Sequence, residues 1–164
     1  MTSVDLPIGI CAVDTPDGTK HYVALTPMDV AFKRGLVPEA IVGVLLHPLQ
    51  QGEAITSANF ARNSVFVEFL HSVIASRGPQ VPGLVAAAKQ QGEGWVYVVD
   101  GRTPTPTGAV APEDIIGAFQ VSGGAIVPTS YQRNENHAIL SKNGFMRLDA
   151  SLQQHLLADL AARA

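Results

Sequence analysis

The chain has 164 residues, a length usual for one globular domain. Hydrophobic residues make up 46% of it and charged residues 15%, whereas about 25% of a typical soluble domain is charged. The net charge is −3 and the one adjacent basic pair is Lys33-Arg34, so nucleic-acid binding through a basic face is not expected.

Because so few charges cover the surface, we expect apolar surface to be buried against a second copy of the chain or another protein. The single cysteine, Cys11, excludes an internal disulfide and a cysteine-based zinc site, and we expect it to be a buried structural residue. Residues 1–5 lack the features of a signal peptide, and the longest apolar run, residues 40–46, is too short to span a bilayer. We therefore expect a cytoplasmic protein without membrane contact.

The first elements in chain order are a predicted β-hairpin and a predicted helix. Residues 7–13 and 21–25 are β-compatible runs on either side of the turn signal DTPDG at 14–18. The segment 26–35 opens with Thr and Pro, which suit a helix N-terminus, and closes with two cations and a glycine, which suit a C-terminus. It therefore predicts a helix.

The next stretch predicts further helices. Residues 38–46 are ambiguous, because Pro38 could open a short helix while the β-branched residues after it favour a strand. Residues 64–77 carry apolar side chains at three- and four-residue spacing, which predicts an amphipathic helix, and Gly78-Pro79 ends it. Residues 82–91 predict another helix. No internal repeat or low-complexity tract is apparent.

The second half predicts mainly strands. The expected elements, in order, are a strand at 95–99, a tight turn at 100–101, a loop at 102–111, a helical turn or strand entry at 112–114, strands at 115–121 and 125–127, a possible strand at 145–148 and an amphipathic helix at 149–164. Together the elements predict one α+β domain over residues 1–164, mainly an antiparallel sheet with about four to five helices. Its helical middle lies within a helix-rich part at 1–92, and a β-rich part follows at 93–164, ending in the C-terminal helix.

Motifs for cofactor and metal chemistry are missing from the sequence. The five histidines form no HxH, HxxxH or HExxH pair, and no glycine-rich phosphate loop follows a predicted strand. We therefore expect neither a metal nor a cofactor. Glu113 and Asp114 are adjacent carboxylates, which suits stabilisation of a helical turn better than a catalytic pair.

Two polar segments are candidate sites. Asp100 and Arg102 stand at the end of an apolar strand, a rigid base on which functional groups are often mounted, although they could serve only the turn. The loop 131–137 is a run of seven polar or polar-tipped residues. Its candidates for ligand or partner binding, together with Arg102, are Tyr131, Arg133, Asn134, Asn136 and His137. A solvated loop is the alternative interpretation.

Two functions fit these features. The leading hypothesis is a non-catalytic cytosolic binding or accessory protein of bacterial type, acting by self-association or on a protein partner through apolar surface and the loop 131–137. The alternative is a small enzyme or ligand-binding domain, in which Arg102 holds an anionic group and Tyr131 completes the pocket. In that case His137, and after it Asp100, are the tentative catalytic residues.

Overall fold

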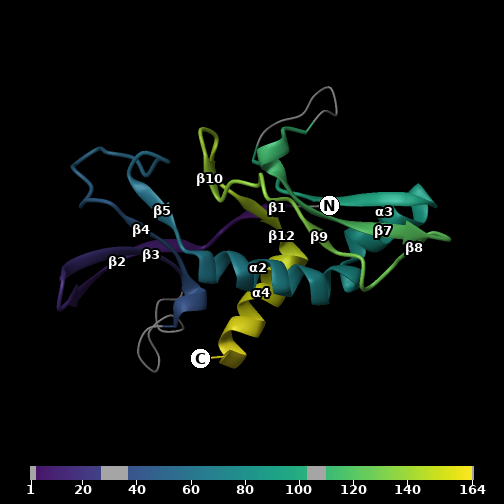
Figure 1. Ribbon diagram of the computed structural model, residues 1–164, viewed down its shortest axis with the longest axis horizontal. Helices are drawn as coiled ribbons and strands as arrows, with labels where there is room; N and C mark the ends of the chain where they lie inside the picture. The colour runs from purple at the N-terminus through teal and green to yellow at the C-terminus, as the bar shows by residue number, and fades with distance from the viewer. Residues whose placement is uncertain (1–2, 27–36, 103–109, 164) are drawn as a thin grey trace.

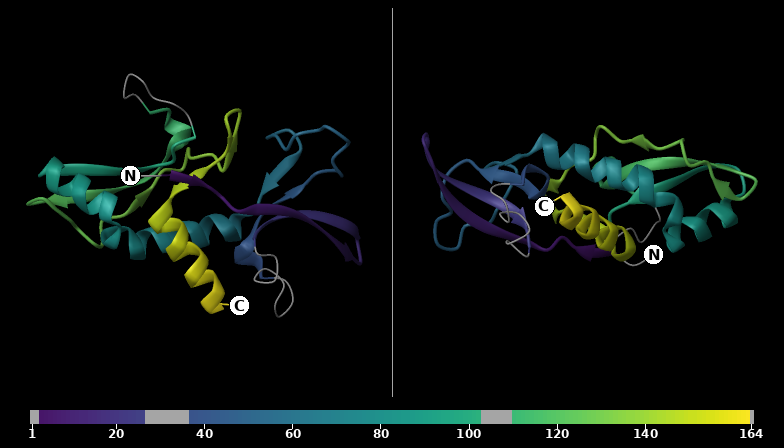
Figure 2. Two further views of the ribbon diagram at one scale, coloured as in Figure 1. Left: turned by 180° about the vertical axis from the view of Figure 1, so that it is seen from behind. Right: turned by 90° about the horizontal axis from the view of Figure 1, so that it is seen from below.

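The computed structural model describes residues 3–26, 37–102 and 110–163; for residue 163 it describes the backbone only. Two β-sheets lie at opposite ends of an elongated molecule, and helices pass between them (Figure 1). The three α-helices described are α2 (Ser64–Arg77), α3 (Pro82–Gln91) and α4 (Ala150–Arg163). Helices α2 and α4 pack against each other between the sheets, as the views from behind and from below also show (Figure 2).

The first sheet is antiparallel, in the order β2-β3-β4-β5. Its strands are β2 (Ile8–Thr15), β3 (Gly18–Leu25), β4 (Ile41–Leu45) and β5 (Phe60–Arg62). A short 3-10 helix, η1 (Pro38–Ala40), leads directly into β4.

The second sheet has β7 at its centre, with β6 on one side and β8 and β9 on the other. Its strands are β6 (Gly94–Val99), β7 (Ile115–Ser122), β8 (Ala125–Ile126) and β9 (Gln132–Arg133). The 3-10 helix η3 (Pro112–Asp114) leads into β7. The remaining elements are η2 (Gly78–Gln80), the ladder of β1 (Ser3–Asp5) with β12 (Arg147–Asp149), and the hairpin of β10 (Leu140–Ser141) with β11 (Gly144–Phe145).

The buried apolar side chains form one continuous core that joins both sheets to the helices. Helix α4 buries Leu152, Leu156 and Leu160, which recur every four residues and so lie on one face. Burial of each such leucine stabilises the fold by roughly 1.5–3 kcal/mol. Helix α2 begins where Asn63 caps it, the side-chain oxygen accepting from the backbone N–H of Val65 at 3.2 Å.

The two sheets contain a repeated unit, which the sequence had not been expected to carry. Residues 37–45 read VPEAIVGVL and residues 111–119 read APEDIIGAF; each stretch folds into a 3-10 turn and a strand. Later in each unit a strand, β5 or β9, ends in an arginine that is followed by an asparagine, Arg62-Asn63 and Arg133-Asn134.

The strand pairing of the two units is the same. Gly43 is the partner of Val23 and of Arg62, and Gly117 is the partner of Val98 and of Arg133. The register of the β3–β4 and β6–β7 ladders also shifts at the same place, directly after these valines. The two units therefore share this irregularity of strand pairing as well as their regular pairs.

Asn63 and Asn134 make the same four hydrogen bonds. The side-chain amide of Asn63 donates to the carbonyls of Pro38 and Ile41, both at 2.9 Å. That of Asn134 donates to the carbonyls of Pro112 and Ile115, at 2.7 and 2.8 Å. In both cases the side-chain oxygen accepts from the amide two residues later, and the backbone N–H bonds to the strand that follows the 3-10 turn. These contacts identify equivalent positions in the two units.

The mixed α+β composition, the first hairpin and the helices at 64–77 and 82–91 are confirmed. The prediction of four to five helices with a helical middle is wrong, because the described chain has three α-helices and the sheet structure is divided between both ends. The ambiguous stretch 38–46 forms η1 and β4, since its β-branched residues pair between β3 and β5. The helix predicted at 26–35 lies, apart from Thr26, outside the described residues. No described helix is long and apolar enough to cross a membrane.

Candidate functional site

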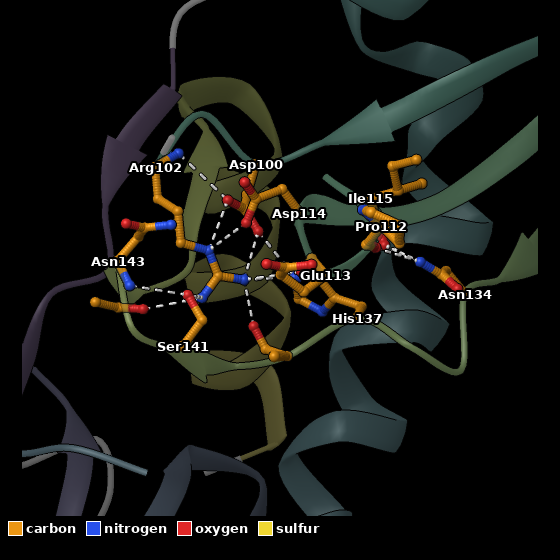
Figure 3. Close-up of polar contacts among 12 residues, drawn as sticks. Asp100, Arg102, Pro112, Glu113, Asp114, Ile115, Asn134, His137, Ser141 and Asn143 are labelled. Carbon is orange, nitrogen blue, oxygen red and sulfur yellow. Dashed lines mark hydrogen bonds and ion pairs between the residues drawn. The ribbon is translucent and has the colours of Figure 1, made fainter. Parts of the chain in front are cut away.

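A buried charge cluster lies where β6, η3 and the segment between β9 and β10 meet (Figure 3). It consists of Arg102, Asp100, Asp114 and His137, whose side chains are respectively 1%, 0%, 2% and 2% exposed. The structure thus brings together Asp100, Arg102 and His137, three of the residues singled out from the sequence. It adds Asp114, which the sequence had suggested only as a partner of the helical turn.

Arg102 is saturated by protein acceptors. Its Nε and Nη2 donate to the two oxygens of Asp100, at 3.0 and 2.9 Å. Its Nη1 donates to the carbonyl of Gly144 at 2.9 Å and to the hydroxyl of Ser141 at 3.3 Å, while Nη2 also donates to backbone carbonyls, among them that of Ala138. A guanidinium has five N–H groups, so no donor is left for a bound anion.

The carboxylates complete the cluster. His137 Nε2 lies 2.9 Å from Asp100 Oδ2, the geometry in which the ring N–H donates to the carboxylate. Asp114 Oδ1 lies 3.0 Å from Arg102 Nε, but no N–H is aligned with it, so this contact is ionic and not a hydrogen bond. The positive guanidinium occupies the centre between two buried carboxylates. Among the described residues, no group of His, Cys, Asp and Glu is arranged to hold a metal ion.

The rest of the loop 131–137 is tied to the protein. The Tyr131 hydroxyl lies 2.7 Å from His71 Nδ1, and this contact is partly buried. Burial lowers the pKa of His71 to about 4 and raises that of Tyr131. A side chain at Gly117 would meet the Tyr131 ring, since an added Cβ would lie 2.5 Å from its hydroxyl. The tyrosine ring therefore depends on glycine at that position.

The other candidates of this loop face different directions. Arg133 forms a paired contact with Glu68 of α2, both bonds at 2.7 Å, and this ion pair is exposed. The Asn134 side chain is occupied by its bonds to η3 and β7, and Asn136 lies exposed at the turn that Asn134 caps. The structure does not gather these side chains around one pocket with Arg102. Cys11, expected to be buried, is partly exposed on β2, because β2 is the outer strand of the first sheet.

An open strand edge lies on the second sheet and was missed from the sequence. Strand β6 pairs with β7 on one side, and no other described strand pairs with it. Trp95 and Tyr97 are 39% and 55% exposed, whereas Val96 and Val98 are buried. Aromatic residues and valines alternate in Trp95–Val98, which is the signal for one open face, whereas only an apolar strand was expected there from the sequence.

A groove runs along this edge, between β6 and α3. It has a volume of about 560 Å³ and is lined by Ala87, Gln90, Gln91, Trp95, Val96 and Tyr97. None of these side chains is charged. The groove therefore combines unpaired backbone, two aromatic rings and amide side chains.

No protein-family model, curated protein or solved structure matches this chain. The two repeat units are therefore the informative comparison. At the positions of Asp100, Asp114 and His137, the first unit has the buried apolar residues Leu25, Ala40 and Phe66. The shared fold thus forms without the charges, and buried ion pairs commonly give no more stability than apolar side chains of similar volume.

In the second unit the cluster contacts an inserted segment that the first unit lacks. In the first unit Asn63 caps α2 directly, whereas residues 135–149 separate Asn134 from α4 and contain the β10–β11 hairpin. Arg102 bonds to Ser141 and Gly144 of that hairpin. We call the cluster a structural clamp, because its contacts hold the β10–β11 hairpin against the end of β6.

Proposed function

We propose that this protein is a non-catalytic binding module that acts through protein–protein contacts, with the outer edge of β6 as its binding surface. The observation that carries the proposal is the unpaired β6 edge beside the α3 groove, with Trp95 and Tyr97 exposed on it. Unpaired strand edges bind extended segments of other chains by adding a strand to the sheet. Main-chain hydrogen bonds supply affinity in this mode, and pockets for alternate side chains supply specificity.

Natural sheet edges usually carry a lysine, a proline or a β-bulge, each of which prevents a strand of another molecule from pairing there. The sequence of β6 is GWVYVV, which contains no charge and no proline. Its register shift lies at the far end of the strand, between Val98 and Val99, and leaves the aromatic part regular. The absence of protection supports an edge that is meant to be covered.

The buried charge cluster gives less support to a catalytic or ligand-binding function. Arg102 has its donors occupied, and its side chain and that of His137 are almost completely buried. Substrate would have to displace Gly144, Ser141 and Asp100 to reach the guanidinium. A clamp that holds the sheet behind the binding edge accounts for these contacts.

A peptide selection tests the proposal. A library of eight-residue peptides is displayed on phage and selected against the immobilised protein at low density, and enriched peptides are then measured against variants. We expect uncharged, β-branched peptides to bind the wild type and to lose at least about tenfold in affinity for Tyr97→Lys, since a charge on the open edge opposes strand pairing. The matched control is Ile10→Lys, at an exposed position on the outer strand of the other sheet.

Two results would count against the proposal. One is a selection that enriches no peptide above background. The other is enriched peptides that bind Tyr97→Lys as tightly as the wild type, because their site would then lie elsewhere. Circular dichroism of each variant shows whether its fold is retained.

A further inference from the structure

We infer that the strand bound at this edge is β6 of a second copy of the chain, paired antiparallel across a twofold axis. The inference rests on the proposed function, and it names the partner of the same surface. The second sheet of one copy and the second sheet of the other would then join through their β6 strands into one continuous sheet.

The repeat unit shows what fits this edge. Strand β3 of the first unit is equivalent to β6, and Tyr22 is equivalent to Tyr97. On β3 the corresponding edge is covered by β2, which runs antiparallel along its whole length and places Cys11 opposite Tyr22. The same unit in the same chain thus accepts an antiparallel strand at this position. In the second unit no described residue supplies that strand.

The chemistry of the edge matches β6 itself. The groove residues carry no charge, so two copies meet there without like-charge repulsion. The segment that fits an uncharged groove is an uncharged extended strand with alternating large and β-branched side chains, which describes residues Trp95–Val98 of β6. Antiparallel pairing of identical strands is also the arrangement that a twofold axis produces, and twofold dimers are the commonest symmetric assemblies.

The register follows from the aromatic side chains. A twofold axis through Val96 places Trp95 opposite Tyr97 of the second copy, and the reverse. Opposite residues of an antiparallel pair project to the same face, so the four rings meet on the open face of the joined sheets. Aromatic cross-strand pairs are among the favourable pairs in sheets. The contact is short, so a micromolar dissociation constant is expected.

Sedimentation equilibrium of the whole chain, from about 1 to about 300 µM, measures the association. We expect a monomer–dimer equilibrium that Tyr97→Lys weakens at least about tenfold. Ile10→Lys is expected to leave it unchanged, because β2 presents neither aromatic rings nor the groove. A wild type that stays monomeric throughout overturns the inference. So does a dimer that Ile10→Lys dissolves or Tyr97→Lys leaves intact.

Photo-crosslinking tests the register. Benzoylphenylalanine replaces Trp95, and unlabelled chains are mixed with ¹⁵N-labelled chains so that crosslinks between copies are recognised by mass. We expect a mixed-isotope adduct on the tryptic peptide 90–102, and none above background when the same group replaces the exposed Leu46. An adduct on another peptide overturns the β6–β6 pairing. If the protein is monomeric but selected peptides still bind at Tyr97, the second-copy inference fails while the proposed binding function stands.

Discussion

Replacing Arg102 with alanine is expected to destabilise the protein by about 3–5 kcal/mol, the usual cost of removing one partner of a buried ion pair. The substitution removes the guanidinium that contacts both Asp100 and Asp114, in a site whose side chains are at most 2% exposed. It also removes the donors to Ser141 and Gly144 that hold the β10–β11 hairpin. A domain of this size commonly has a total stability of about 5–15 kcal/mol, so a large fraction would be lost.

Urea denaturation followed by circular dichroism and tryptophan fluorescence measures the effect. Arg133→Ala is the matched control, because it removes an arginine whose two bonds to Glu68 are exposed to solvent, and its effect should be small. A loss for Arg102→Ala below about 1 kcal/mol would refute the account of a buried clamp, since an exposed pair costs no more than that.

The repeat supplies a second variant for the same account. Asp100→Leu, Asp114→Ala and His137→Phe reproduce the residues of the first unit, and Arg102→Met removes the cation with them. The fourfold variant is expected to be more stable than Arg102→Ala, because no buried charge is left unpaired. If it is as unstable as the single variant, the charges themselves are required for folding.

Two further predictions concern the packing behind the open edge. Gly117→Ala should cost about 1–3 kcal/mol in thermal unfolding, as overpacking against Tyr131 does. Gly52→Ala meets no atom within 4 Å, but Gly52 has a φ of +81°, so its cost reports backbone strain without crowding. His71 has its pKa lowered from 6.5 to about 4 by burial, so the unfolded chain takes up its proton first as the solution is acidified. The free energy of unfolding should therefore fall as the pH is lowered from 6.5 to about 4. In urea midpoints measured across that range, His71→Gln should flatten this pH dependence. If the variant shows the same pH dependence as the wild type, other groups cause the loss of stability.

Local patterns determined which elements could be predicted. The apolar spacing along 64–77 and the stop at Gly78-Pro79 are short-range signals, and they predicted α2 with its bounds. Residues 38–46 carried conflicting signals, and the conflict was resolved by pairing with β3 and β5, far away in the chain. The repeat was missed because few residues are shared and loops of different length separate them.

In the candidate site, too, the residues could be recognised from local sequence, whereas their contacts depend on distant parts of the chain. Asp100, Arg102 and His137 were recognisable as polar residues in an apolar setting, and the structure places them in contact. Their saturation depends on backbone carbonyls, such as those of Ala138 and Gly144, which no side-chain pattern reveals. The edge at Trp95 and Tyr97 was overlooked because an unpaired strand edge is a property of the topology and not of the strand's own residues.

Hydrogen–deuterium exchange of the β6 amides tests the central claim most directly, because it reports on the unpaired edge itself. The account predicts that amides of Gly94–Val99 exchange faster in dilute protein than in concentrated protein. It further predicts that Tyr97→Lys abolishes this difference and that the amides of β2 show none. Equal exchange of the β6 amides at both concentrations, and with or without a peptide selected for binding, would contradict the account.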